Sequence, residues 1–321
     1  MASLPTISIV IPTLNQGRFI AEAIESLLVQ DYPALEVMVI DGGSGDGTLD
    51  VIRRFESRLS YWESAEDEGQ SHAINKGFAR SSGEIVNWLN SDDRLEPGAL
   101  QEIGRLAIRH PEKALFLGRT RVFDEAGTIR VSGQILFGDD ETTIGFGQVS
   151  QPAMFYRRSV LGAIGPLDQR LHMCMDLHLW LKFLLFAGVG GVGSSDSVWA
   201  AFRLHGGSKT MSAGAAWERE KAIVYRSLFE HLGLDVDPGL LPPASILLSY
   251  PPAARIRRER CLSSYLLWRA DALRLDGNSR EARRLFCRVR PGTLARAQLR
   301  RYLAVAARLW GRGWNDAAGT S

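Results

Sequence analysis

ISIVI, at residues 7–11, is an apolar run that ends at PTLN (12–15), and two runs of the same kind follow: LEVMVID at 35–41 and EIVNWLNSDD at 84–93. Apolar residues at helical spacing come after the first run, from Ile20 to Leu28, and the same spacing recurs after the second. Strands that are apolar throughout and alternate with helices are typical of sheets covered on both faces. The pattern therefore predicts an α/β fold with a mostly parallel sheet flanked by helices.

Polar residues stand at the carboxyl ends of these strands. They are Thr13 and Asn15 beyond the first run, Asp41 as the last residue of the second run, and NSDD (90–93) as the last four residues of the third. Because ligands of open α/β sheets bind outside the carboxyl ends of the strands, these are the candidate binding residues.

The composition fits a globular protein with one large domain, or with a domain and an appendage. The chain has 321 residues, of which 45% are hydrophobic and 23% are charged. Cys174, Cys261 and Cys287 form no CxxC pair, which argues against a disulfide framework or a cysteine zinc site and favours a reducing compartment. No run reaches the roughly 18 apolar residues of a membrane span, and no basic segment precedes the first run. We expect a cytoplasmic protein.

Charge divides the chain into two parts. Residues 254–314 hold sixteen arginines, no lysine and four acidic residues, for a net charge of +12, while the rest of the chain carries −10. Two parts of opposite charge suggest two tasks. We predict a catalytic domain at 1–235, a proline-rich linker at 236–253 and a basic helical region at 254–321.

The basic region has three interpretations. It could bind nucleic acid, although it contains no recognisable nucleic-acid module, or it could be a solvated helical face or a hairpin that docks a partner. It could also lie on an anionic membrane surface. The apolar anchors in that case would be Trp268, Leu275, Tyr302, Leu309, Trp310 and Trp314.

The glycine-rich loop GGSGDG (42–47) does not match a dinucleotide-binding fingerprint. That motif needs G-x-G-x-x-G after the first strand, whereas this loop follows the second strand and its third glycine is misplaced. A tight turn that leads into a helix is the simpler explanation.

Asp92 and Asp93 are adjacent carboxylates, which repel each other unless water or a cation separates them. Such oxygen ligands suit Mg²⁺ or Mn²⁺, although a turn before Pro97 explains the pair equally well. His205 follows an apolar strand, and a lone histidine is usually structural. Asp176 begins an apolar helix, where an acidic residue also favours the helix dipole. These residues indicate a metal-dependent site only in combination.

In combination and order, the segments resemble the family-2 inverting glycosyltransferases, which have the GT-A fold and use nucleotide-diphosphate sugars. The resemblance is carried by ISIVIPTLN (7–15), VIDGGSGDGT (39–48), AINKG (73–77), WLNSDD (88–93), QPAMFYRRS (151–159), MDLHLWL (175–181) and FRLHGGSKT (202–210). It covers about residues 5–232. Among family members it is strongest toward enzymes that build bacterial surface polysaccharides.

The resemblance implies a role for single residues. Asp176 would be the general base that deprotonates the acceptor hydroxyl in one inverting displacement. Asp93 and His205 would bind a divalent Mn²⁺ or Mg²⁺ that bridges the diphosphate. The residues implied to bind the nucleotide sugar are Pro12, Thr13, Asn15, Asp41, Asn75, Lys76, Asn90 and Asp92.

Two positions depart from the family pattern. Met175 stands where many members have Glu before the catalytic Asp, and Asn90 makes the metal motif differ from a strict Asp-x-Asp. The second departure leaves open whether Asp92 contacts the metal.

We therefore expect a metal-dependent inverting glycosyltransferase with a GT-A domain and a C-terminal helical appendage. Its partners would be a nucleotide-diphosphate sugar and a saccharide acceptor, lipid-linked, for exopolysaccharide, capsule or O-antigen, and not nucleic acid. It would work in the cytoplasm, with peripheral contact at the inner face of the membrane. The sugar, base and linkage are not specified.

Two alternatives remain. A sugar nucleotidyltransferase would need a Gly- and Lys-rich N-terminal signature, which residues 12–15 lack. A non-catalytic nucleotide-sugar-binding subunit would not need Asp93, Asp176 and His205 together.

Overall fold

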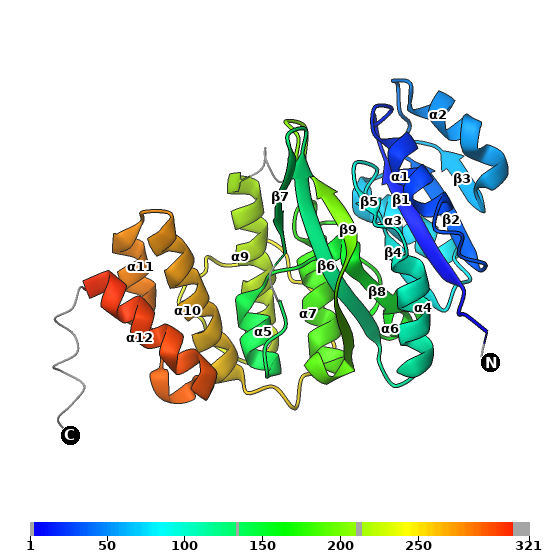
Figure 1. Ribbon diagram of the computed structural model, residues 1–321. Helices are drawn as coiled ribbons and strands as arrows, with labels where there is room; N and C mark the ends of the chain where they lie inside the picture. Colours follow the sequence, from blue (N-terminus) through cyan, green and yellow to red (C-terminus); the bar gives the residue numbers. More distant parts are fainter. Residues whose placement is uncertain (1–2, 133–134, 210–213, 311–321) are drawn as a thin grey trace. The chain divides into compact units, whose positions relative to one another are not determined.

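The computed structural model describes residues 3–132, 135–209 and 214–310 (Figure 1). The chain groups into two compact units. The first comprises Met1–Gln134, Val149–Phe183 and Gly190–Lys221, and the second comprises Ile135–Gln148, Leu184–Val189 and Ala222–Ser321. Contacts within a folded chain do not test which segments fold alone, so the three domains expected from the sequence stay a prediction.

The first unit is built on one mixed sheet, whose strands follow the order β3-β2-β1-β4-β8-β6-β9-β5, with β7 paired to β6. The four strands β3, β2, β1 and β4 are parallel to their neighbours, and β6 pairs with β9 in parallel too. Pairings through β8, β5 and β7 are antiparallel. The strands are β1 Ile7–Thr13, β2 Leu35–Asp41, β3 Tyr61–Ser64, β4 Ile85–Trp88, β5 Arg94–Leu95, β6 Leu115–Asp124, β7 Gly127–Val131, β8 Met154–Arg157 and β9 Val192–Arg203.

Helices separate the parallel strands, which confirms the predicted α/β fold. In the first unit they are α1 Ile20–Leu28, α2 Thr48–Phe55, α3 Gln70–Arg80, α4 Ala99–Arg109 and α6 Arg158–Ile164. Helices α7 Met175–Ala187 and α9 Gly214–His231 contribute residues to both units. No helix in the described part of the chain has the length and apolar character needed to cross a bilayer.

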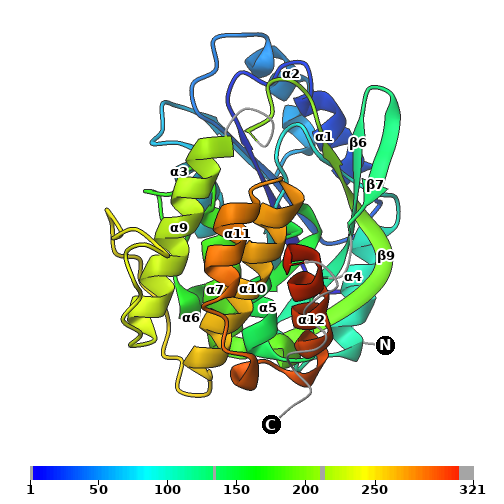
Figure 2. The same ribbon diagram turned by 90° about the vertical axis from the view of Figure 1, so that its left-hand side faces the viewer.

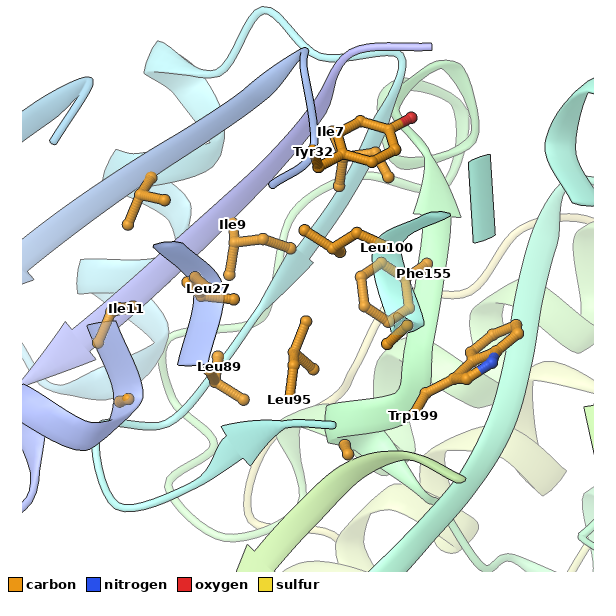
Figure 3. Packing of buried hydrophobic residues seen from close by; sticks show 14 of the residues in the cluster. Ile7, Ile9, Ile11, Leu27, Tyr32, Leu89, Leu95, Leu100, Phe155 and Trp199 are labelled. Carbon is orange, nitrogen blue, oxygen red and sulfur yellow. The ribbon is translucent and has the colours of Figure 1, made fainter. Parts of the chain in front are cut away.

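Strand β1 lies at the centre of the parallel part and is buried along its whole length. Its odd-numbered residues, such as Ile9, join the core shared with α1 and α4, whereas Val10 on the other face meets α3 at Gly77. This two-residue period places helices on both faces of the sheet. Figure 3 shows Ile7, Ile9 and Ile11 packed with Leu27, Leu100 and Phe155.

Pro12 lies inside β1, although a proline cannot donate a hydrogen bond to a neighbouring strand. The carbonyl of Val10 accepts the N–H of Leu89 on the β4 side, and backbone groups alternate sides along a strand. Pro12 therefore faces the same side as Val10, beyond the point where pairing with β4 ends at Trp88. The proline costs the sheet no bond, and β1 extends to Thr13 beside Asp41 of β2.

The second unit is helical in its described residues. Its helices are α5 Asp140–Phe146, α10 Arg258–Leu275, α11 Ser279–Phe286 and α12 Arg296–Trp310. Helix α10 packs on α5, where a Cβ atom on Gly145 would come within 2.4 Å of Ser264. Figure 2 shows α10, α11 and α12 as neighbours, which confirms the expected cluster of basic helices.

Candidate functional site

The carboxylate of Asp41 holds the glycine-rich loop after β2. Its Oδ2 accepts the backbone N–H groups of Gly43 (3.2 Å) and Ser44 (3.0 Å) and the hydroxyl of Ser64 (2.6 Å). Its Oδ1 accepts the hydroxyl of Ser44 at 2.5 Å. Gly43 has φ of +89°, a conformation that glycine adopts without strain. Asp41 thus already receives four bonds from its own chain, and its contact with a nucleotide base stays a prediction.

Thr13 and Asn15 stand beside this loop at the end of β1. Asn15 has φ of +53°, and its Oδ1 accepts the N–H of Gly45 at 2.9 Å, which links the two loops. The hydroxyl of Thr13 is buried and has no hydrogen-bond partner among the residues that the structure describes. Because buried polar groups are almost always paired, this hydroxyl is suited to contact a ligand. Pro12, Thr13, Asn15 and Asp41 therefore lie at the carboxyl ends of the neighbouring strands β1 and β2, as predicted.

Asn75 and Lys76, on α3, are engaged with other parts of the first unit. Asn75 donates from Nδ2 to the carbonyl of Leu167 (2.9 Å) and accepts the N–H of the same residue at Oδ1 (3.0 Å). Lys76 forms an ion pair with Glu63. That pair and the hydroxyl of Tyr61 contribute to a lowered pKa for Glu63, against the opposing effect of burial. These contacts hold α3 to its neighbours, and the role of both residues in nucleotide binding stays a prediction.

Asp92 and Asp93 point to different partners. The Oδ2 of Asp92 lies 3.1 Å from Nε2 of His205, and both side chains remain partly exposed. Asp93 is buried, with its Oδ1 accepting the backbone N–H of Arg203 at 2.9 Å and its Oδ2 accepting Nδ2 of Asn90 at 3.2 Å. Burial, and next the charge of Asp92, raise the pKa of Asp93 well above its usual range. His205 thus contacts Asp92. The buried carboxylate of Asp93 links the segment that carries Asp92 to the backbone of Arg203, two residues before His205.

The Asp92–His205 pair has the chemistry of a small-cation site with few protein ligands. Mg²⁺ and Mn²⁺ accept carboxylate oxygens, and Mg²⁺ in phosphate-binding sites is held by one or two carboxylates together with phosphate oxygens. Within residues 3–132, 135–209 and 214–310, no group of three or more His, Cys, Asp or Glu side chains is placed to hold a metal alone. The residues present fit a cation whose remaining ligands come from a diphosphate.

The imidazole of His205 is oriented by its own loop. Its Nδ1 accepts the N–H of Gly207 at 3.2 Å, which assigns the proton of the neutral ring to Nε2. Because a neutral imidazole binds a cation through its unprotonated nitrogen, a cation at Nε2 would require the tautomer that carries the proton on Nδ1.

Asp176 lies in the first turn of α7, where the backbone N–H groups of a helix favour a negative charge. Its Oδ1 accepts the N–H of Leu177 at 2.7 Å. Burial nevertheless dominates and raises the pKa of Asp176 to about 6. A carboxylate with a pKa near this value is largely ionised at neutral pH and is a stronger base than an ordinary aspartate.

Lys209 and Gln70 are site residues that the sequence analysis did not single out. The Nζ of Lys209 donates to Oε1 of Gln70 (2.7 Å) and to the carbonyl of His172 (3.3 Å), and Gln70 donates to Asn90 at 2.7 Å. Burial lowers the pKa of Lys209, and Glu220, Asp92 and Asp176 counteract it. Lys209 is therefore within electrostatic range of both Asp92 and Asp176, and it connects the candidate metal pair to the candidate base.

Glu220, on α9, binds the segment that leads into α7. Its carboxylate accepts the backbone N–H groups of His172 (2.9 Å), Met173 (2.7 Å) and Cys174 (3.0 Å). Three consecutive N–H groups that converge on one carboxylate fix the backbone just before Asp176.

The only sequence signal for Lys209 is its position four residues after His205, and Glu220 has none.

Comparison with known proteins agrees with this geometry. The sequence profile described as Glycosyl transferase family 2 matches residues 8–165. An uncharacterized glycosyltransferase of Mycobacterium tuberculosis is 31% identical over 189 residues, which cover 58% of this chain and 71% of that protein.

Two solved structures share the fold. One is Staphylococcus aureus TarS in complex with UDP-GlcNAc, with a TM-score of 0.61 and 20% identity over 95% of this chain and 80% of that one. The other is a mannosyltransferase from Pyrobaculum calidifontis in complex with GDP-Man and Mn²⁺, with a TM-score of 0.52 and 18% identity over 96% and 88% of the two chains. Both likenesses support the predicted GT-A fold.

Proposed function

This chain belongs to glycosyltransferase family 2, and on that premise we propose that it is a metal-dependent inverting enzyme. It transfers a sugar from a nucleotide-diphosphate sugar to a hydroxyl group of a saccharide acceptor. The acceptor in this proposal is carried on a lipid and belongs to cell-surface polysaccharide synthesis. A non-catalytic binding subunit would gain nothing from a carboxylate held at high pKa near a cation-binding pair.

The position and ionisation of Asp176 are the observation that carries the proposal. The carboxylate is held at the start of α7, its pKa is raised to about 6 by burial, and Lys209 lies within electrostatic range of it and of Asp92. Bases in enzyme sites work best when their pKa is close to the working pH.

The proposed reaction is a single displacement at the anomeric carbon. The acceptor oxygen forms a new bond to that carbon as the bond from the carbon to the diphosphate oxygen breaks. Asp176 takes the proton of the acceptor hydroxyl, and the nucleoside diphosphate leaves with the electron pair of the broken bond. Attack from the face opposite the leaving group inverts the configuration. One carboxylate is sufficient, because the leaving group departs as an anion and needs no proton.

Asp92 and His205 are the residues that we propose for the cation, which differs from the sequence prediction of Asp93 and His205. A bound Mn²⁺ or Mg²⁺ supplies charge neutralisation on the leaving diphosphate. Asp93 would then hold the segment of Asp92 in place through the N–H of Arg203. Thr13, with its unpaired hydroxyl, is the best supported nucleotide contact.

A donor screen tests this proposal. The full chain is heated with UDP-, GDP- and dTDP-linked sugars, with and without Mn²⁺, and release of the nucleoside diphosphate is followed in parallel. A ligand at 100 times its dissociation constant stabilises the native state by about 2.7 kcal/mol. We expect Mn²⁺-dependent stabilisation and slow hydrolysis with one nucleotide class. Folded protein that responds to none of the donors would overturn the proposal.

A further inference from the structure

The outer face of α12 combines exposed apolar side chains with arginines. The helix spans Arg296–Trp310 and contains no acidic residue. Leu303 is 56% exposed, and Leu299 and Trp310 are each 37% exposed. Its buried residues, such as Val305 and Leu309, face the rest of the second unit. Large apolar side chains are therefore present on both sides of this helix, and only one side is covered in the described residues.

The exposed residues form an ordered pattern around the helix axis. At 3.6 residues per turn, Leu299, Leu303 and Trp310 fall within about 40° of one another. By the same geometry Arg296 and Arg300 follow within the next 60° or so. An apolar stripe thus runs along the helix with arginines directly beside it. We call Leu299, Leu303, Trp310, Arg296 and Arg300 the α12 face.

Ion pairs within the second unit show which arginines are already neutralised. Acidic partners are assigned to Arg255, Arg257, Arg274, Arg284, Arg288, Arg290 and Arg301. Arg296, Arg300 and Arg308 have no acidic partner in the described part of the chain. Arg296 and Arg300 therefore present charges on the exposed part of α12 that no ion pair within the described residues neutralises.

The six apolar anchors expected from the sequence differ in their burial and packing partners. Leu309 is buried, and Trp268 packs against Phe137 and Phe146. Tyr302 stacks on Phe286, so it is committed to the unit as well. Leu275 is exposed at the end of α10, and Trp314 lies outside the described residues. Only Trp310 of the six belongs to the α12 face, where it is partly exposed while its ring also contacts Phe286 and the guanidinium of Arg283.

We propose that the α12 face binds the anionic surface of a lipid bilayer. Leu299, Leu303 and Trp310 would enter the boundary between headgroups and acyl chains, and the arginines would meet lipid phosphates. A second copy of the chain is a poor occupant, because it would bring the same arginines face to face. Nucleic acid would pair with arginines but would leave the leucine stripe uncovered. The proposal does not depend on the catalytic assignment.

Vesicle co-sedimentation of the full chain tests the proposal. The vesicles are pure phosphatidylcholine, or phosphatidylcholine with about 30% phosphatidylglycerol, at physiological ionic strength, where surface charge still attracts basic segments. We expect binding to the anionic vesicles only. Two double variants, Leu299→Ser with Leu303→Ser and Arg296→Gln with Arg300→Gln, should each weaken binding by about tenfold or more.

Matched controls separate this face from general effects. Arg284→Gln with Arg288→Gln removes two charges that are paired elsewhere in the second unit, and Ile129→Ser with Val131→Ser removes two exposed apolar residues from β7. Both controls should bind as wild type does. Because every changed side chain is at least partly exposed, unfolding midpoints should stay unchanged. Equal binding to neutral vesicles, no binding to either, or full binding by either α12 variant would overturn the proposal.

Discussion

At the residue scale, Asp92 and Asp93 show how two identical neighbours acquire different tasks. Only Asp92 meets the imidazole of His205, while Asp93 is buried and accepts the N–H of Arg203. The sequence could locate the pair at the end of β4, but it could not decide which of two adjacent carboxylates faces the ligand. That choice depends on the path of β9, more than 100 residues away.

The two aspartates can be separated by matched substitutions. Asp92→Asn should remove the Mn²⁺-dependent part of donor binding, because the cation loses its carboxylate ligand. Asp93→Asn should lower stability by about 1–3 kcal/mol, because one of its two bonds must be lost or reversed, and leave Mn²⁺-dependent binding in the protein that is folded. Calorimetric titration of donor with and without Mn²⁺ distinguishes them. If Asp93→Asn removed Mn²⁺-dependent donor binding and Asp92→Asn did not, Asp93 would be the cation ligand.

The raised pKa of Asp176 also has a consequence for stability. The folded carboxyl keeps its proton up to a pH of about 6, whereas the unfolded one loses it near the ordinary value of 3.8. Between these values the folded state binds more protons, so its stability decreases as pH rises through this window. Asp176→Asn should therefore stabilise the protein at pH 8 by up to about 3 kcal/mol and give no such gain at pH 3.5. Urea unfolding at both pH values measures this, and an equal effect at both would contradict the shift.

Glu220 is expected to act as a positioning residue for Asp176. Glu220→Gln would weaken the three backbone bonds at residues 172–174, because a neutral amide is a poorer acceptor than a carboxylate. We expect the turnover rate to fall by about tenfold while donor affinity is kept, as for a misplaced catalytic group. Glu230→Gln makes the same charge change on the same helix, where this carboxylate pairs with Arg226, and should leave the turnover rate unchanged. Loss of donor affinity in step with turnover would argue for a merely structural role.

At the element scale, the parts with a strong local signal were predictable. Helix α1 spans Ile20–Leu28, the range that the apolar spacing marks, and β2 covers the predicted run at 35–41. Helix α5 was not predicted, and its composition explains why. Its buried residues include Glu141, Thr142 and Thr143, so no apolar period marks it. Glu141 is neutralised by Arg257, whose presence beside it only the fold reveals. Glu220 on α9 and Lys209 were not singled out either, because their partners lie far away in the sequence.

The contact between α3 and β1 can be tested with two helical glycines. A Cβ atom on Gly77 of α3 would come within 2.4 Å of Val10, whereas one on Gly162 of α6 would meet nothing within 4 Å. Gly77→Ala should cost about 1–3 kcal/mol of unfolding free energy through overpacking. Gly162→Ala should be neutral or stabilise by up to about 1 kcal/mol, because alanine favours helices. Chemical denaturation compares the two, and equal effects would show that α3 does not press on β1.

At the scale of the whole molecule, charge and chemistry are divided between segments. The candidate catalytic residues from Thr13 to Glu220 all belong to the first unit, and the α12 face belongs to the second. The charge balance of the sequence suggested two tasks, and that division stays a prediction. The sequence could not show that residues 135–148, which precede Asp176 in the chain, join the second unit. Such a crossing has no local signal, because the division also falls inside continuous helices: α7 and α9 each contribute residues to both units.

The central claim is that Asp176 is the base of a sugar transfer from a nucleotide donor. The most direct test measures donor affinity and the rate of nucleoside diphosphate release in Asp176→Asn, with Asp196→Asn on the exposed part of β9 as the control. Removal of a general base costs about 10²–10⁴ in rate, while the donor contacts are untouched. We predict a loss of that size in Asp176→Asn, with donor affinity close to that of wild type. Release at the wild-type rate by this variant would contradict the account.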